Sequence, residues 1–364
     1  MLLGGIQTVL ITLQSNLKSM VDIKTLVAKF KDRFSKERFC VGLDIGTSTI
    51  KIVKLKFSKD TVELCSFGLE PSQPDPEEAL RRVKQSLPAT DIANIGVCGS
   101  STVIRYVNFP QMNKDELRQA LKFEAQKHIP FSLEEVNFDG YILKEALPDN
   151  KMLVLLAAVK KDLISQRLKL IEDAGFKADI IDIDSIALCN AFAFNYQADE
   201  NPKHKAIALL NIGSSMSNLN ILEDGIPCLS RDIHLGGDNF TQKLMEVFGT
   251  DFNCAEKLKF NPDKEKAAKI TIAFEALLTN LAAEVRTSFD YYESQSTSSV
   301  VKIFLSGGGS KFAGLKDMLA NFLGIEVEYW DPLKKISISG NLDSQRLKEV
   351  SEQMAVAIGL ALRQ

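Results

Sequence analysis

Apolar and polar residues along the chain predict two similar β-hairpins, one in each half. In the first, an apolar strand beginning at residue 41 leads into Asp44, a polar turn occupies 46–49, and an alternating return strand ends near residue 55. The same pattern recurs between residues 208 and 222. A third apolar strand, at 300–305, leads into three consecutive glycines. A repeated hairpin of this kind predicts an α/β protein built from two similar halves.

The remaining periodicity predicts further strands and helices between these points. Strands are expected at 61–69, 94–98, 103–109, 136–143, 152–159, 178–183 and 226–233, and helices at 77–86, 113–128, 161–174, 184–196, 269–293 and 344–363. The block at 111–176 has a helix–strand–strand–helix order that differs from the pattern of its surroundings, which predicts an inserted subdomain. The helix at 184–196 is expected to join the two halves.

These elements divide the chain into six predicted parts. They are an N-terminal extension with a basic amphipathic helix (1–38), the first half of domain 1 (39–110), the inserted subdomain (111–176), the return strand and linker helix of domain 1 (177–200), domain 2 (201–340) and a C-terminal helix closing on domain 1 (341–364).

The N-terminal extension has its own charge pattern. Residues 22–36 place apolar side chains at helical spacing, and basic side chains cover the rest of the helix. Peripheral contact with an anionic membrane surface is one expectation, and a linker helix packed on the body is the other. Met20 is an alternative start, because the fold pattern begins only near residue 39.

Composition narrows the class of protein. The chain is 45% apolar and 25% charged, as in ordinary globular proteins, and its net charge of −3 gives no argument for a nucleic-acid partner. The six cysteines form no Cys-x-x-Cys motif, which favours reduced thiols and a cytoplasmic setting. None of the three histidines has the spacing of a structural zinc site.

Candidate phosphate chemistry lies at the first hairpin turn. Asp44, at the strand end, can hold Mg²⁺ through water, because this hard cation keeps much of its hydration. Gly46 lets the backbone approach a phosphate. The N–H and hydroxyl groups of Thr47 and Ser48 can donate to phosphate oxygens. The chain contains no Gly-x-x-x-x-Gly-Lys-Ser/Thr sequence, so a Walker-type phosphate loop is excluded.

The two hairpins followed by Leu305-Ser306-Gly307-Gly308-Gly309 resemble the layout of the actin, Hsp70 and sugar-kinase fold. This is an actin-like, ribonuclease H-like duplicated nucleotide-binding fold, here with an inserted subdomain. The resemblance implies that both hairpins face ATP and Mg²⁺. The expected nucleotide-binding residues are Asp44 (also the metal residue), Gly46, Thr47, Ser48, Asn211, Gly213, Ser214, Ser215, Gly236, Gly237, Glu256, Lys259, Gly307 and Gly308.

Several of these residues have individual expectations. Gly236 and Gly237 open a helix, whose first N–H groups favour phosphate. Glu256 and Lys259 resemble an Ala-Glu-x-x-Lys pattern that meets ribose and adenine, although a solvated helix face has the same spacing. The backbone of the glycine triplet is expected to pass under the adenine ring. Lys51, on the first return strand, is expected to pair at the surface.

A narrower resemblance lies in the block Glu124-Ala125-Gln126-Lys127-His128-Ile129-Pro130-Phe131, supported by Asp182–Leu188 and Ala357–Arg363. These segments resemble the PilM family of type IV pilus assembly proteins. The resemblance implies an FtsA-like fold at the inner face of the cytoplasmic membrane, with the short cytoplasmic N-terminus of a PilN-like membrane protein as partner. Apolar side chains that could bind this peptide, or else form ordinary core, are Phe109, Leu117, Leu121, Ile129, Pro130 and Phe131.

Asn211 departs from the pattern of active enzymes with this fold, which usually place an aspartate there. Since a neutral amide cannot act as a carboxylate base, we expect ATP binding with weak turnover at most. An FtsA-like membrane-associated division filament, with self-association, is the first alternative. A small-molecule kinase of the same superfamily and the related platform domain of type II secretion are the others.

Overall fold

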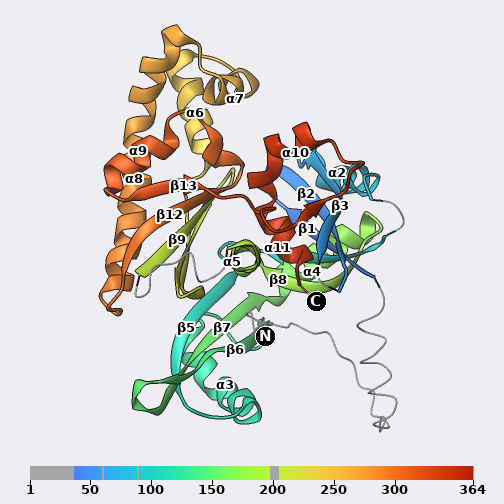
Figure 1. Cartoon of the computed structure of the whole chain (residues 1–364), viewed down its shortest axis with the longest axis vertical. Helices are drawn as coiled ribbons and strands as arrows, with labels where there is room; N and C mark the ends of the chain where they lie inside the picture. The colour runs from blue at the N-terminus through green and yellow to red at the C-terminus, as the bar shows by residue number, and fades with distance from the viewer. Residues whose placement is uncertain (1–36, 60, 88–89, 197–204, 364) are drawn as a thin grey trace.

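The structure is a computed structural model that describes residues 37–59, 61–87, 90–196 and 205–363. The helix expected at 22–36, its membrane contact and the alternative start at Met20 lie outside the described residues. Two lobes, domain 1 and domain 2, stand side by side with α5 (Asp184–Asn195) and α11 (Ala355–Ala361) between them, and a smaller unit lies below (Figure 1).

Each lobe contains a sheet of the same topology. The order is β14-β3-β2-β1-β4-β8 in domain 1 and β11-β10-β9-β12-β13 in domain 2, so that an antiparallel three-stranded meander is extended by two parallel strands in both. The strands of domain 1 are β1 (Arg38–Ile45), β2 (Thr49–Phe57), β3 (Val62–Pro71), β4 (Ile92–Val97), β8 (Lys177–Ile183) and β14 (Ser337–Ile338). Those of domain 2 are β9 (Lys205–Ile212), β10 (Ser217–Glu223), β11 (Ile226–Ile233), β12 (Ser299–Ser306) and β13 (Glu326–Tyr329).

The repeated topology explains the repeated sequence pattern. Strands β1 and β9 are central in their sheets, so their apolar runs are buried on both faces, while their ends carry the polar turns. Helices cover the outer faces. They are α2 (Pro76–Lys84) and α4 (Lys161–Asp173) in domain 1, and α6 (Gly237–Phe248), α8 (Lys264–Glu293) and α9 (Leu315–Leu323) in domain 2, where α7 (Phe252–Phe260) packs on α6.

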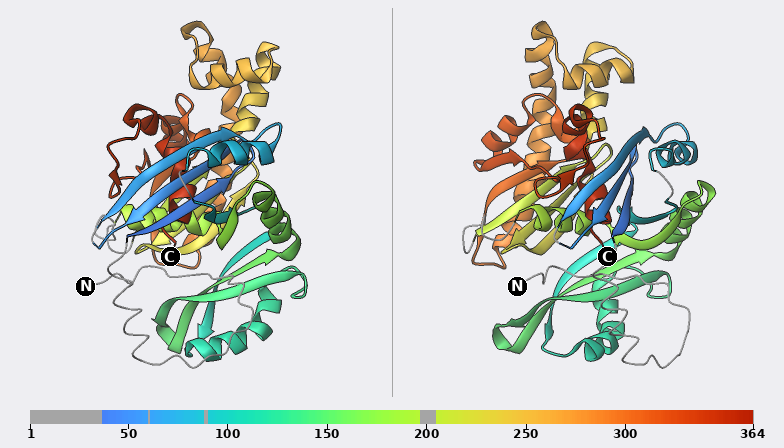
Figure 2. Two further views of the ribbon diagram at one scale, coloured as in Figure 1. Left: turned by 90° about the vertical axis from the view of Figure 1, so that its right-hand side faces the viewer. Right: turned by 45° about the vertical axis from the view of Figure 1, so that its right-hand side comes forward.

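The smaller unit, which we call the insert, has its own sheet and core. Its strands β5 (Thr102–Pro110), β6 (Val136–Leu147) and β7 (Lys151–Lys160) pair in the order β5-β7-β6, and α3 (Lys114–His128) packs on them. It lies at the opposite end of the molecule from α7 and the start of α8 (Figure 2).

The boundaries of the insert differ from the predicted range of 111–176. Strand β5 belongs to the sheet of the insert, so the insert begins at Thr102. Helix α4 instead packs Ile164 and Ile171 into the core of domain 1. Residue periodicity predicts a strand or a helix but not the sheet that receives it, which is why the sequence misplaced both edges.

The C-terminal segment also differs in one respect from its prediction. In place of one helix at 344–363 there are α10 (Ser344–Val350), a 3₁₀ turn at 351–354 and α11. At the break, the Glu352 carbonyl accepts a hydrogen bond from Gly307 N–H at 2.9 Å, and Lys311 pairs with the Glu352 carboxylate at 2.7 Å. The break therefore lets the segment contact domain 2 before α11 enters domain 1.

Helix α11 lies against β1 and α5 through small residues. A Cβ added at Gly359 would meet the Ala187 carbonyl oxygen at 1.9 Å or less, and one at Gly42 would meet that of Ala357 at 1.9 Å. At the end of the helix, Arg363 pairs with buried Asp182 at 2.8 Å. None of the helices in the described ranges is long and apolar enough to cross a membrane.

Candidate functional site

The two hairpin turns, one from each lobe, are in direct contact. The Thr47 hydroxyl lies 2.6 Å from that of Ser214 and 3.2 Å from that of Ser215, although 167 and 168 residues separate them in the chain. The backbone N–H groups of Ser48 and Ser215 donate to no other group within the described part of the chain. Hydroxyls and amides from both lobes therefore converge where a phosphate chain could lie.

Asp44 and Lys51 form an ion pair at the base of the first turn. They are directly opposite each other on β1 and β2, and Lys51 Nζ lies 2.9 Å from Asp44 Oδ2. Both side chains are largely shielded, with exposed fractions of 15% for Lys51 and 9% for Asp44. Lys51 Nζ also lies 3.2 Å from the position of a Cβ on Gly46. The lysine thus lies at the base of the first turn and is largely shielded, contrary to the expectation of a surface pair.

Asp184, the first residue of α5, is a site residue that sequence reasoning missed. It is buried near Asp44, and its Oδ1 has no hydrogen-bond partner among the described residues. Burial, together with the charge of Asp44, raises the pKa of Asp184 to about 7. The carboxylate also has a hydrogen bond with the Cys98 thiol. A buried carboxylate oxygen without a partner, next to a second carboxylate, fits a divalent cation, which would relieve both effects. The signal in the sequence was an aspartate directly after a buried strand, as at Asp44.

The raised pKa predicts a specific pH dependence of stability. Between pH 4 and 7 the folded protein holds a proton on Asp184 that the unfolded chain has lost, so stability falls as pH rises through this range. Asp184→Asn removes this effect. We expect its advantage in Tm over wild type to be small at pH 4.5 and to grow by roughly 3–6 °C at pH 8.

Thermal unfolding at a series of pH values, without nucleotide or metal, measures this difference. Asp173→Asn, an exposed aspartate at the end of α4, is the matched control and should show no such trend. A Tm difference between Asp184→Asn and wild type that stays constant from pH 4.5 to pH 8 would contradict the assignment.

Gly236 and Gly237 support the second hairpin turn and do not offer free amides. Gly237 N–H donates to the Gly213 carbonyl at 2.9 Å, and Gly236 N–H donates to Asn239 Oδ1 at 2.8 Å. A Cβ on Gly236 would lie 2.4 Å from the Ser214 carbonyl oxygen. The expectation that these two N–H groups face phosphate is therefore wrong in this conformation, because the protein itself uses them. The glycines instead let α6 approach the turn closely.

Glu256 and Lys259 lie together beside α6. The Lys259 ammonium is 3% exposed and donates to Thr241 Oγ1 at 2.7 Å, to the Gly237 carbonyl at 3.2 Å and to Glu256. Burial lowers the pKa of Lys259. The lysine thus ties α7 to α6, and the half-exposed Glu256 carboxylate is the group of this pair that can reach a ribose.

The glycine triplet lies against the end of β9. Gly307 has a φ of +89°, and a Cβ there would lie 2.3 Å from the Ile212 carbonyl oxygen. The Asn211 side chain is beside it and accepts a hydrogen bond from Ser306 Oγ at 3.1 Å. Gly308 is adjacent to the Gln353 side chain. Asn211, Gly307 and Gly308 thus lie together near the second turn, and their contact with a nucleotide stays a prediction.

The predicted partner residues divide by burial. Phe109, Leu117, Leu121 and Ile129 are 2–5% exposed and form the core of the insert. Pro130 is exposed, and Phe131 is partly exposed with Lys160 Nζ 4.5 Å from its ring centroid. The four buried side chains cannot meet a partner in this conformation, so Pro130 and Phe131 are the accessible part of the predicted surface.

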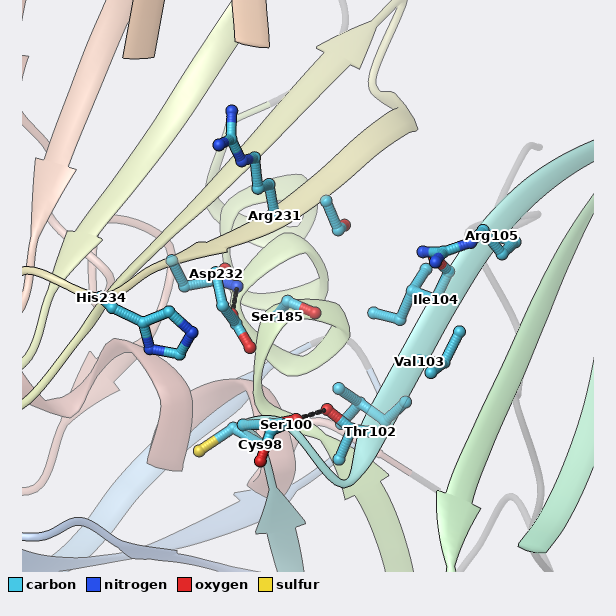
Figure 3. A pocket seen from close by; sticks show the side chains of 14 residues that line it. Cys98, Ser100, Thr102, Val103, Ile104, Arg105, Ser185, Arg231, Asp232 and His234 are labelled. Carbon is cyan, nitrogen blue, oxygen red and sulfur yellow. Dashed lines mark hydrogen bonds between the residues drawn. The ribbon is translucent and has the colours of Figure 1, made fainter. Parts of the chain in front are cut away.

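A cavity of about 260 Å³ adjoins the site where the insert meets both lobes. Cys98, Ser100 and Thr102 line it from domain 1 and the start of β5, and Asp232 on β11 and His234 just after this strand line it from domain 2 (Figure 3). Arg231 points away from the other labelled side chains, whereas the Arg105 guanidinium extends across β5 and donates to the Ile104 carbonyl at 2.9 Å (Figure 3). Their guanidinium groups do not converge, so the cavity lacks the geometry of an anion site.

Comparison with known proteins gives one family match and several structural ones. The family model of type IV pilus assembly protein PilM matches residues 42–364. The structure of the PilM-PilN type IV pilus biogenesis complex matches with a TM-score of 0.78 at 24% identity, covering 89% of this chain and 97% of that one. Ethanolamine utilization protein EutJ from Carboxydothermus hydrogenoformans matches with a TM-score of 0.52 at 14% identity, covering 91% of this chain and 92% of that one.

Curated relatives match over shorter stretches. Cell division protein FtsA from Bacillus subtilis (strain 168) is 23% identical over 257 residues, which are 60% of this chain and 57% of FtsA. Chaperone protein dnaK from Cyanophora paradoxa is 29% identical over 121 residues, which are 32% of this chain and 19% of the chaperone. The chain thus spans between a fifth and three fifths of these relatives. Together with the duplicated sheets, the matches confirm the predicted actin-like fold.

Proposed function

The chain belongs to the PilM family of type IV pilus assembly proteins, and from this premise we propose that it binds ATP with Mg²⁺ between its lobes and a PilN-like partner on its insert. The partner segment is the cytoplasmic N-terminal peptide of that membrane protein, which would place this chain at the inner face of the cytoplasmic membrane. The observation that carries the nucleotide half is the contact of the two hairpin turns through Thr47 and Ser214.

The charged groups around the turns support a magnesium nucleotide. Asp44 and Asp184 would hold a hydrated Mg²⁺, and Lys51 would exchange its carboxylate partner for a phosphate oxygen. When bound, the metal screens the phosphate charge. The hydroxyls of Thr47, Ser214 and Ser215 are close enough to orient the phosphates from both lobes at once.

Weak turnover follows from the group at the end of β9. Asn211 is neutral, and its side-chain oxygen already accepts the Ser306 hydroxyl. It offers neither a charge for Mg²⁺ nor a base for the attacking water, on which phosphoryl transfer depends. The nucleotide would therefore act as a bound ligand that sets the conformation of the lobes more than as a substrate.

The partner half is supported by the similarity to the PilM-PilN complex and by the exposed part of the insert. Pro130 and Phe131 follow α3 and lie next to Lys160, at the junction of the insert with α4. An extended apolar peptide could pack on this ring and proline, because both present apolar surface at little cost in side-chain entropy.

Calorimetric titration of the full chain tests both halves. We expect ATP with Mg²⁺ to bind, the N-terminal peptide of the PilN-like protein to bind, and phosphate release from the ATP complex to be slow. A chain that binds neither ligand would refute the proposal, and brisk phosphate release would refute weak turnover alone.

Phe131→Ala tests the partner surface. We expect it to lower affinity for the peptide about tenfold, which corresponds to about 1.4 kcal/mol, while Tm changes little. Leu121→Ala is the matched variant in the same unit. Its side chain is 4% exposed, so we expect a loss of about 2–4 kcal/mol of stability. If the affinity for the peptide were unchanged in Phe131→Ala, the partner would have to bind at another surface.

A further inference from the structure

A chain of polar side chains crosses the face of the domain 2 sheet that is turned toward domain 1. Ser306, Asn211, Asn218 and Asp232 are successive neighbours on β12, β9, β10 and β11. Asn220 and Ser230 form a second pair, two residues further along β10 and β11. Asn220 is fully buried, so polar groups here carry a cost unless they are hydrogen-bonded to one another.

These side chains form one oriented series of hydrogen bonds. Ser230 donates its hydroxyl to Asn220 Oδ1 at 2.5 Å, the Asn220 amide donates to Asn218 Oδ1 at 2.6 Å, and the Asn218 amide donates to Asp232 Oδ1 at 2.7 Å. The carboxylate is the final acceptor and fixes the direction of the series. Bonds aligned in this way strengthen one another in a buried setting.

The series begins in the insert. The Tyr106 hydroxyl, on β5, lies 2.7 Å from Ser230 Oγ. Since the Ser230 hydroxyl donates its single proton to Asn220, Tyr106 must be the donor in its hydrogen bond with Ser230. Burial raises the pKa of Tyr106, so the phenol keeps that proton. Near the other end of the series, Asn218 is directly opposite Asn211 and follows Ser214 and Ser215 by only a few residues, which brings the series next to the proposed nucleotide site.

The junction between β5 and domain 2 combines a cavity with a polar contact. Beside Tyr106, the cavity separates the start of β5 from Asn218, Ser230 and Asp232, so this junction is not closely packed. The strand leaves domain 1 through Gly99, whose φ is +89°. Strand β5 contacts β11, where the Tyr106 hydroxyl meets Ser230, and Ile104 and Tyr106 also pack against the core of domain 1.

We propose that the series from Tyr106 through Ser230, Asn220 and Asn218 to Asp232 couples nucleotide binding at the second hairpin to the position of the insert, and thereby regulates the partner site. Phosphate held by Ser214 and Ser215 fixes the turn, and the turn fixes the register of β10. This inference rests on the proposed function, since it requires a nucleotide between the lobes.

Hydrogen exchange measured by mass spectrometry tests the coupling without a partner peptide. The probe is the ATP analogue ADPNP with Mg²⁺, added at saturation to the full chain. In wild type we expect exchange in β5 and β6 to change at least fivefold, within the usual range of coupling between two sites. In Tyr106→Phe, which keeps the ring, we expect less than a twofold change while ADPNP still binds.

Two sets of variants distinguish loss of coupling from a general loss of folding. Ser230→Ala should abolish the response, and Ser230→Thr, which keeps the hydroxyl, should retain it. Tyr291→Phe, an exposed tyrosine on α8, should behave as wild type. The inference alone would be overturned if wild type bound ADPNP without a change in hydrogen exchange in β5 and β6, or if Tyr106→Phe showed the same change as wild type. Absence of ADPNP binding in wild type would remove the proposed function and this inference with it.

Discussion

Replacing Asp44 with alanine is expected to lower the affinity for ATP in the presence of Mg²⁺ about a hundredfold, or roughly 2.7 kcal/mol. The carboxylate lies at the base of the first turn, where we propose that the magnesium nucleotide binds, and a charge-assisted contact contributes about 1.5–3 kcal/mol. Its removal also leaves Asp184 alone in the same buried region, where one carboxylate binds a divalent cation much less well than two.

The dependence on metal distinguishes this role from simple loss of structure. Without Asp44, Lys51 has no carboxylate partner and is free to attract phosphate, so binding of metal-free ATP should change little. The affinity for ATP measured with Mg²⁺ and the affinity measured with a chelator should therefore differ strongly in wild type and hardly at all in Asp44→Ala. Asp173→Ala, on the exposed end of α4, is the control for charge. A variant that keeps the full effect of Mg²⁺ would show that other residues hold the metal.

The hairpins could be predicted because their signal is local. An apolar run, a glycine and hydroxyl turn, and an alternating return strand determine β1–β2 and β9–β10 without reference to the rest of the chain. That the two turns face each other depends on the duplicated sheets, and the sequence indicated this only through the repeat. Thr47 and Ser214 were therefore placed correctly, whereas the groups that surround them were not.

What the sequence could not show depends on three-dimensional context. Lys51 was expected at the surface because return strands often alternate, but register puts it opposite Asp44. Asp184 has the same local setting as many helix starts, and only its burial marks it. Apolar spacing in α3 was equally consistent with a peptide pocket and with a core, and Leu117 and Leu121 proved to be core. Likewise, the use of the Gly236 and Gly237 amides depends on contacts with the second turn.

The crossing of α5 and α11 is the part of the fold least tolerant of change. Both helices lie between the lobes, and their backbones approach because Gly359 has no side chain. The nearest atoms to a Cβ at this position are the carbonyl oxygen and carbon of Ala187, at 1.8 and 2.4 Å. These are backbone atoms, so no rotamer change can relieve the contact and the helices themselves must separate.

Gly359→Ala is therefore expected to cost at least about 3 kcal/mol, the upper end of ordinary overpacking, and to lower Tm by roughly 5–10 °C. Thermal unfolding followed by circular dichroism measures the change. Gly340→Ala is the matched control, because nothing lies within 4 Å of the added Cβ and its φ is not left-handed. There we expect Tm to stay the same or rise slightly.

A second variant separates backbone contact from side-chain crowding. If the clash involves the backbone of α5, adding Ala187→Gly to Gly359→Ala should recover little stability, because the carbonyl remains in place. Recovery of most of the lost Tm would show that the two methyl groups were the problem. Because α5 also begins at Asp184, separation of the helices should displace that carboxylate. Gly359→Ala is then expected to weaken the dependence of ATP binding on Mg²⁺ at temperatures where the variant is still folded.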